Sequence, residues 1–181
     1  NISGTRDKYY DRVNYETPEL NYGVGFNLEL NKNLSVEGTL NPDFSQVESD
    51  ATRIDINSPT AINYPEKRPF FNRGIDAMDY QIDVFYSRSI NDPSFASKII
   101  NQGRKSRLYV LSAFDEQTPY LVPTQYESFS GIVGKSFSNV LRYQNFINSK
   151  TQIGFLASNR YYEGDAYGNL YGFDALFNFS D

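Results

Sequence analysis

The side chains best suited to chemistry are carboxylates that gather in a polar stretch, 41–71, which interrupts a series of alternating segments. The first half of this stretch carries Asp43, Glu48, Asp50 and Asp55. Carboxylates of this kind bind calcium, and two of them about 5–10 Å apart can hydrolyse a glycoside. Their spacing matches neither an EF-hand loop nor a recognisable catalytic pair. We therefore predict no metal, no cofactor and no catalytic residue here.

The second half of the stretch ends in a charged knot, Glu66-Lys67-Arg68, which stands between Pro65 and Pro69 and precedes Phe70-Phe71. The prolines predict that neither a helix nor a central strand forms here. Packed phenylalanines would draw the knot out of bulk water, and Arg68 would then need a carboxylate partner. The candidates are Asp43, Glu48 and Asp50. We therefore predict an ordered insert held by an ion pair, against the ordinary alternative of a solvated turn.

The composition of the 181 residues excludes several function classes. The net charge of -5 argues against a nucleic-acid partner, which would need a basic surface over its phosphates. His and Cys are both absent, which excludes disulfides, Cys/His zinc sites and nucleophilic mechanisms that need an imidazole base. The chain starts without Met or a signal-like segment, so we expect a mature product or an excerpt of a longer polypeptide.

Tyrosines mark the two longer links that we expect between strands, 116–127 and 161–169. They are Tyr120, Tyr126, Tyr161, Tyr162 and Tyr167. Tyrosine beside carboxylates and amides can stack on sugars, but the same composition forms an aromatic girdle at a membrane interface. We favour the girdle and keep sugar contact as the second interpretation.

Alternating apolar residues predict the strands that would position these side chains. Over 20–30 every even-numbered residue is apolar and the others are polar or glycine, which is the pattern of a strand with one apolar face. A turn at 31–33 and renewed alternation over 34–40 complete an antiparallel hairpin. Tyr and Phe, which make up the aromatic content of 16%, also favour β structure.

Further strands are expected at 80–88, 96–102, 107–114, 128–137, 140–147, 151–158 and 170–179. Short turns alternate with longer links between them. That rhythm is typical of an antiparallel up-and-down meander whose two ends face different environments. No stretch shows a persuasive helical period.

The last of these strands has the dimensions of a membrane span. The nine residues 171–179, with a rise of about 3.3 Å each and a tilt of about 40°, give roughly 23 Å, close to the height of an outer-membrane apolar band. A soluble sandwich also accommodates strands of this length, so periodicity leaves both architectures open. The sequence has no run of eighteen apolar residues, so we expect no membrane-spanning helix.

Three motifs carry a family resemblance: NPDFSQVESD from Asn41, PEKRPFF from Pro65 and VFYSRSI from Val84. In this order they resemble the outer-membrane β-barrel-like domain of unknown function that follows a family-nine-type carbohydrate-binding domain in Gram-negative surface proteins. The resemblance covers residues 21 to about 90, and beyond them only the strand rhythm matches. Asn72-Arg73-Gly74 replaces the apolar-acidic-glycine turn that is usual in that family, so the family's loop geometry does not transfer.

The alternation and the resemblance together predict an all-β fold, an antiparallel up-and-down meander that forms an outer-membrane β-barrel, or part of one, with an inserted plug. We expect a single domain over 1–181, with 41–74 as a lumenal or capping excursion. The expected location is the cell outer membrane, with its lipid as partner. Glycans or other surface proteins are further candidate partners. The expected role is structural, scaffolding or transport-related, without catalysis; the alternative is a soluble or surface-exposed carbohydrate-binding module.

Overall fold

The computed structural model describes residues 4–6, 13–15, 22–42, 44, 66–78, 85–123 and 128–179, with the backbone alone at 4–6, 13–15, 121–123 and 128–130. The main element of these residues is a seven-stranded sheet in the order β11-β10-β9-β6-β5-β4-β3. Every pairing in it is antiparallel. Strands that follow one another in the chain are neighbours, except that β7 and β8 intervene between β6 and β9. The predicted all-β antiparallel meander is thereby confirmed.

The strands of the main sheet are β3 (Val24–Glu29), β4 (Leu34–Leu40), β5 (Pro93–Gln102), β6 (Ser106–Asp115), β9 (Ser136–Asn148), β10 (Thr151–Tyr162) and β11 (Tyr167–Phe177). Two separate hairpins pair β1 (Gly4–Arg6) with β2 (Val13–Tyr15), and β7 (Thr118–Pro123) with β8 (Ser128–Val133). The described helical turns are α2 (Pro69–Asn72), η1 (Ile75–Met78) and η2 (Ser87–Ser89).

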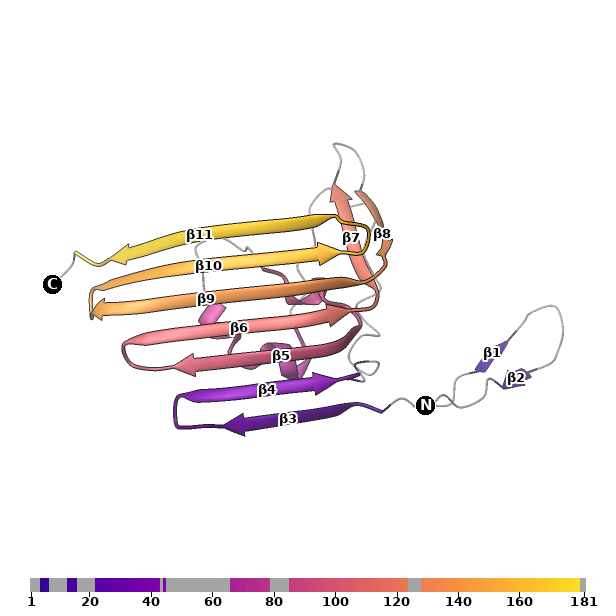
Figure 1. Ribbon diagram of the computed structural model, residues 1–181, viewed down its shortest axis with the longest axis horizontal. Helices are drawn as coiled ribbons and strands as arrows, with labels where there is room; N and C mark the ends of the chain where they lie inside the picture. Colours follow the sequence, from indigo (N-terminus) through magenta and orange to yellow (C-terminus); the bar gives the residue numbers. More distant parts are fainter. Residues whose placement is uncertain are drawn as a thin grey trace.

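The two ends of the sheet differ in their connections (Figure 1). At one end, called here the short-turn end, tight turns at 30–33, 103–105 and 149–150 join neighbouring strands. The opposite, long-loop end carries residues 41–42 after β4, residues 90–92 before β5, the β7–β8 hairpin between β6 and β9, and the turn 163–166 between β10 and β11. The predicted difference between the two ends is therefore present.

Cross-strand register divides the side chains of the sheet between two faces. The outer face is defined by the row of consecutive partners Val36, Ile99, Val110, Leu141, Ala157 and Tyr171. The inner face is defined by the row Thr39, Ala96, Ala113, Ser138 and Arg160. Every other residue of the sheet belongs to one of these faces by the period of two.

The buried core lies on the inner face, which residues 66–78 and 85–90 cover (Figure 1). Phe71 of α2, Ala77 of η1 and Ile90 after η2 are fully buried there. The sheet contributes Ala96, Ile100, Tyr109, Leu111, Ala113 and Val140. Of the excursion predicted at 41–74, residues 66–74 lie in this second layer, which continues through 75–78 and 85–90.

The outer face leaves large apolar side chains in the open. Those with more than a third of their surface exposed include Val24, Phe26, Leu28, Leu40, Phe95, Ile99, Phe137, Tyr143, Ile153, Tyr171, Phe173 and Phe177. Phe173 is 80% exposed. Single exposed apolar residues are ordinary on a protein surface, but here they recur on the outer-face positions of six of the seven strands. Among the described residues no helix is long and apolar enough to cross a membrane.

Three predicted boundaries were wrong. The longer link expected at 161–169 is a turn over 163–166, because β10 continues to Tyr162 and β11 begins at Tyr167. The turn expected at 137–139 lies inside β9, and the chain turns at 134–135 instead. Ser138 and Asn139 read as turn residues, yet both have partners on the strands at either side. The link expected at 116–127 contains β7, whose prolines are tolerated because β7 pairs with β8 alone and keeps a free edge.

The excursion also departs from expectation in its local structure. Over the described end of the strand predicted at 80–88, residues 85–86 are irregular and η2 follows. Ser87 is buried there and bonds to the charged knot, so packing against the knot decides its conformation. One helical turn, α2, does form at the prolines, because Pro69 stands at its start, where no intrahelical hydrogen bond is lost.

Candidate functional site

Two side chains of the charged knot, Glu66 and Arg68, are withdrawn from solvent, and Arg68 has 3% of its surface exposed. Its Nε donates to Glu66 Oε1 at 2.9 Å and its second terminal nitrogen donates to Glu66 Oε2 at 2.8 Å. The same guanidinium donates to the carbonyls of Ile90 and Ser87, at 2.7 and 3.0 Å. The bidentate pairing with Glu66 fixes the guanidinium plane. The bonds to the two carbonyls tie residues 66–68 to residues 87–90.

Aromatic rings enclose the Arg68 guanidinium. Its central carbon lies 4.1 Å from the Phe71 ring centroid and 5.2 Å from that of Phe44. The two rings also contact each other, with centroids 5.9 Å apart. A guanidinium held over ring faces away from water gains a cation–π interaction in addition to its hydrogen bonds.

Glu66 is fully engaged by its neighbours. Its Oε1 accepts from the backbone and the side chain of Arg68, and its Oε2 accepts from Arg68 and from the Ser87 hydroxyl at 2.6 Å. Burial alone would raise the pKa of Glu66, but the hydrogen bonds from Arg68 and Ser87 outweigh it and hold that pKa below its ordinary value of 4.5. A carboxylate so occupied is stabilised as a structural anion and has no oxygen left for proton transfer.

A second ion-pair group joins the excursion to the sheet. Lys98 of β5, which is 1% exposed, lies 3.3 Å from Glu37 Oε2 of the neighbouring strand β4. Its ammonium also donates to the carbonyl oxygens of Phe70 and Arg73, the latter at 2.7 Å. Arg73 in turn donates to Glu37 Oε1 at 3.0 Å. The ammonium therefore binds the chain just after the knot to the inner face.

A third pair crosses one strand of the sheet. Arg142 of β9 and Asp174 of β11 form two hydrogen bonds, of 2.5 and 2.9 Å. The strand between them is β10, and Gly154 lies under the pair. Arg142 is 1% exposed, so this pair extends the charged network of the inner face to the edge strand β11.

Two inner-face residues also bind the chain that precedes β5 at the long-loop end. Asp115 is fully buried and accepts hydrogen bonds from the backbone N–H groups of Asn91 and Asp92, at 2.9 and 2.7 Å. Arg160 of β10 donates to Ser138 Oγ at 2.6 Å and to the carbonyl of Ser89 at 3.1 Å. The excursion is thus bonded to the sheet at both of its described ends.

The structure brings Glu66 and Arg68 together and leaves Lys67 exposed. Asp43, Glu48, Asp50 and Asp55 lie outside the described residues. The predicted pairing of Arg68 with that acidic half therefore stays a prediction, beside the pairing with Glu66. Sequence reasoning did not single out the other pairs, Glu37–Lys98 and Arg142–Asp174. The sequence feature that could have indicated them is a charged residue at an inward-facing position of a strand with alternating apolar residues.

The predicted tyrosines do not form one cluster. Tyr161 and Tyr167 are direct cross-strand partners at the ends of β10 and β11, and both are exposed. Tyr162 is the partner of Ser136 on the opposite face. Tyr120 is exposed on β7, and Tyr126 lies outside the described residues. Of these tyrosines, within the described part of the chain, only Tyr161 and Tyr167 are direct cross-strand partners.

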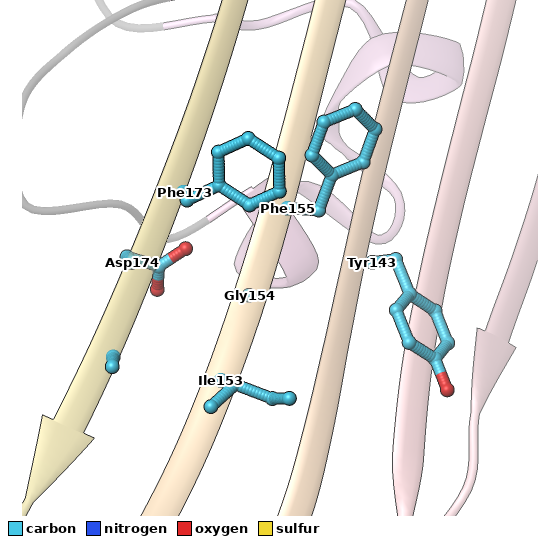
Figure 2. A pocket seen from close by; sticks show the side chains of 7 residues that line it. Tyr143, Ile153, Gly154, Phe155, Phe173 and Asp174 are labelled. Atoms are coloured by element: carbon cyan, nitrogen blue, oxygen red, sulfur yellow. The ribbon is translucent and has the colours of Figure 1, made fainter.

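The outer face carries a hollow of about 480 Å³ near the β11 edge. Its apolar walls are Tyr143, Ile153, Phe155, Phe173 and Ala175. Figure 2 shows the Phe155 and Phe173 rings side by side on neighbouring strands, and their centroids are 5.0 Å apart. Among the described residues no three His, Cys, Asp or Glu side chains gather as metal ligands do. The hollow is suited to hydrocarbon, since polar groups are few along its walls.

Comparison with known proteins gives one match. The model of a family described as a domain of unknown function (DUF5916) matches residues 3–108, which is more than half of the chain. The matched part includes β3, β4, the charged knot and β5. No curated protein and no solved structure matches the chain.

Proposed function

The chain belongs to this family of domains of unknown function, and we propose that its seven-stranded sheet is part of the wall of an outer-membrane β-barrel with a structural, scaffolding or transport-related role. In this proposal the outer face contacts lipid and segment 66–90 is part of a lumenal plug. The carbohydrate-binding context suggested by the sequence motifs belongs to the same proposal.

The observation that carries the proposal is the distribution of apolar and charged groups over the two faces. Large apolar side chains are exposed on the outer face, whereas Lys98, Arg142 and Asp115 are buried on the inner face. A soluble two-layer protein buries its apolar face and exposes its charges. Barrel strands in a membrane do the reverse, with apolar residues outward and polar residues inward.

The edges of the sheet fit the same proposal. Among the described strands β3 and β11 each have a neighbour on one side only, so within this part of the chain the other side of each has no strand partner. Unpaired backbone groups are costly in a hydrocarbon environment, and a spanning sheet must therefore close. Further strands, paired with β3 and β11, would complete the wall.

Catalysis is not part of the proposed role. Four described carboxylates that are withdrawn from solvent are committed to structural bonds: Glu66 to Arg68, Glu37 to Lys98, Asp174 to Arg142, and Asp115 to the backbone of residues 91–92. A general acid or base needs an oxygen that can reach a substrate proton. We propose instead that these groups hold the plug on the wall.

The absence of cysteine makes a direct test possible, since single cysteines can be labelled without background. Phe173→Cys and Leu170→Cys lie on opposite faces of β11 and are both exposed. Each variant is labelled with an environment-sensitive fluorophore and added to vesicles that contain a lipid-attached quencher. We expect strong quenching at position 173 and weak quenching at position 170. Equal quenching, or a chain that stays monomeric in plain buffer and ignores vesicles, would refute the proposal.

The second candidate, carbohydrate contact, is supported by Tyr161 and Tyr167 as exposed cross-strand partners. Two adjacent rings provide the surface on which a sugar face stacks. This candidate predicts that the chain binds a soluble glycan in buffer and that Tyr161→Ala abolishes the binding. Tyr120→Ala, on a different hairpin, is the matched control.

A further inference from the structure

The short-turn end of the sheet is basic. Its turns carry Lys32, Arg104, Lys105 and Lys150, all of them exposed. The turn segments 30–33, 103–105 and 149–150 contain no acidic residue. Two described carboxylates lie beside these turns: Glu29, the cross-strand partner of Ser35, and Asp76, which accepts hydrogen bonds from the Gln102 side chain at 3.0 and 3.2 Å. Four cations therefore share one edge of the molecule.

Backbone hydrogen bonds hold these turns in a row. The N–H of Gln102 donates to the carbonyl of Asn33 at 2.8 Å, which joins the first turn to the second. The N–H of Phe146 donates to the carbonyl of Lys105 at 2.9 Å, which joins the second turn to β9. The N–H of Asn178 donates to the carbonyl of Lys150 at 2.8 Å and ties the third turn to the end of β11. The cations are thus presented from a fixed rim.

A hollow lies within this rim. It measures about 630 Å³ and is lined by Arg104, Lys105 and residues 145–149. Asn145 and Asn148 supply amide groups beside the two cations. The site therefore offers positive charge and hydrogen-bond donors to an anion with several oxygens.

Apolar side chains of the outer face lie next to the basic turns. Leu30, Ile147 and Phe177 stand at the strand ends that enter or leave these turns, and each is more than half exposed. Apolar groups on one side and cations on the other give the arrangement that anchors proteins at the boundary between acyl chains and headgroups.

The opposite end has the opposite charge. At the long-loop end the described connections expose Asp92, Glu163 and Asp165, and Glu116 there is paired with Lys135 at 2.9 Å. The sheet is therefore charged differently at its two ends. A membrane whose surface is anionic would attract one end and repel the other.

From these observations we infer that the short-turn rim, formed by Lys32, Arg104, Lys105 and Lys150, docks onto the headgroup phosphates of an anionic phospholipid bilayer. The inference rests on the proposed function, in which the outer face enters lipid. It adds the chemistry of the lipid and the orientation of the chain: the short turns lie at the phospholipid surface and the long loops point away from it.

The test measures association of the full chain with vesicles of phosphatidylcholine alone and of phosphatidylcholine mixed with phosphatidylglycerol, by flotation over a lipid titration. The rim variant is Lys105→Gln/Lys150→Gln. The control, Lys67→Gln/Lys135→Gln, changes the net charge equally but lies away from the rim. Each cation near an anionic surface raises the association constant by about 5-fold. The rim variant, which lacks two cations, should therefore lose about 25- to 30-fold of the preference for anionic vesicles. The control should keep that preference.

The possible results distinguish a failure of this inference from a failure of the proposed function. Association with neutral vesicles without any preference for anionic ones would overturn the inference and leave the proposed function standing. Equal losses in the rim and control variants would overturn it as well. If inorganic phosphate removes the preference while chloride at the same ionic strength does not, the hollow binds free phosphate and the bilayer assignment is wrong. Failure to associate with either vesicle overturns both.

Discussion

Arg142 and Asp174 belong to strands that do not touch, and their side chains meet above the strand between them. The two hydrogen bonds of 2.5 and 2.9 Å pass over Gly154 of β10. A Cβ atom at position 154 would lie against Asp174 Oδ1 and 2.5 Å from an Arg142 terminal nitrogen. The ion pair between Arg142 and Asp174 therefore requires a glycine at position 154.

Gly154→Ala should consequently push the two charges apart. We expect a loss of about 1–3 kcal/mol in the free energy of unfolding, as for other insertions into a packed site. Gly168→Ala on β11 is the matched control, because a Cβ there meets nothing within 4 Å. Urea unfolding followed by circular dichroism measures both variants. Equal losses in the two variants would show that the ion pair does not require a glycine at position 154.

Phe173→Arg tests which medium the outer face contacts. In lipid an arginine near mid-strand should cost about 2–4 kcal/mol of folded stability, whereas Leu170→Arg on the opposite face of β11 should cost much less. Urea titration of chain reconstituted in vesicles gives the comparison. Similar losses at positions 170 and 173 would contradict lipid contact by the outer face.

For the neighbouring change, Asp174→Arg, the structure raises the expected loss of folded stability. From the alternation alone it is expected to cost far less than Phe173→Arg, because position 174 faces inward. In the structure it would place a second guanidinium against buried Arg142 and leave that charge without Asp174. We now expect a loss of about 3–5 kcal/mol for Asp174→Arg, measured in the same titration.

Arg68→Ala should loosen the excursion. The change leaves Glu66 buried without its bidentate partner and the Ile90 and Ser87 carbonyls without a donor, which should cost about 3–5 kcal/mol. Limited proteolysis should then cut within 66–90 far faster than in the parent chain. Arg104→Ala, in the exposed turn 103–105, should leave the cleavage rate unchanged. Protection that persists without Arg68 would show that apolar packing alone holds the excursion.

Acid should release the same segment through Glu66. Its folded pKa lies below the ordinary value of 4.5, so its stabilising contribution is complete above that value and is lost as the pH falls through the folded pKa. Proteolysis within 66–90 should therefore accelerate on acidification below about pH 4.5. Glu66→Gln should remove this part of the pH dependence. An unchanged profile in the Gln variant would assign the acid response to other carboxylates.

Glycan hydrolysis is not expected from this chain. Both oxygens of Glu66 accept hydrogen bonds, and the sequence has no His or Cys to replace it as a base or nucleophile. Incubation with reducing-end-labelled oligosaccharides should yield no new reducing ends. Turnover that disappears in Glu66→Gln or Asp43→Asn would overturn this prediction.

The alternation of residues predicted much of the sheet before any coordinates. β4 was placed at its observed bounds, and β5, β6 and β11 to within three residues. The alternation over 170–179 also puts Phe173 and Asp174 on opposite faces, as in β11. A period of two fixes these features locally, because successive side chains of a strand must point to opposite sides.

Only the tertiary structure decided which face is covered and how its charges pair. Alternation separates two faces but does not say which of them meets a second layer, and here the excursion covers the face that bears Lys98 and Arg142. The pairing of Lys98 with Glu37 follows from strand register, and that of Arg142 with Asp174 from a glycine in the strand between. Such contacts join residues distant in sequence, so local pattern alone predicts neither of them.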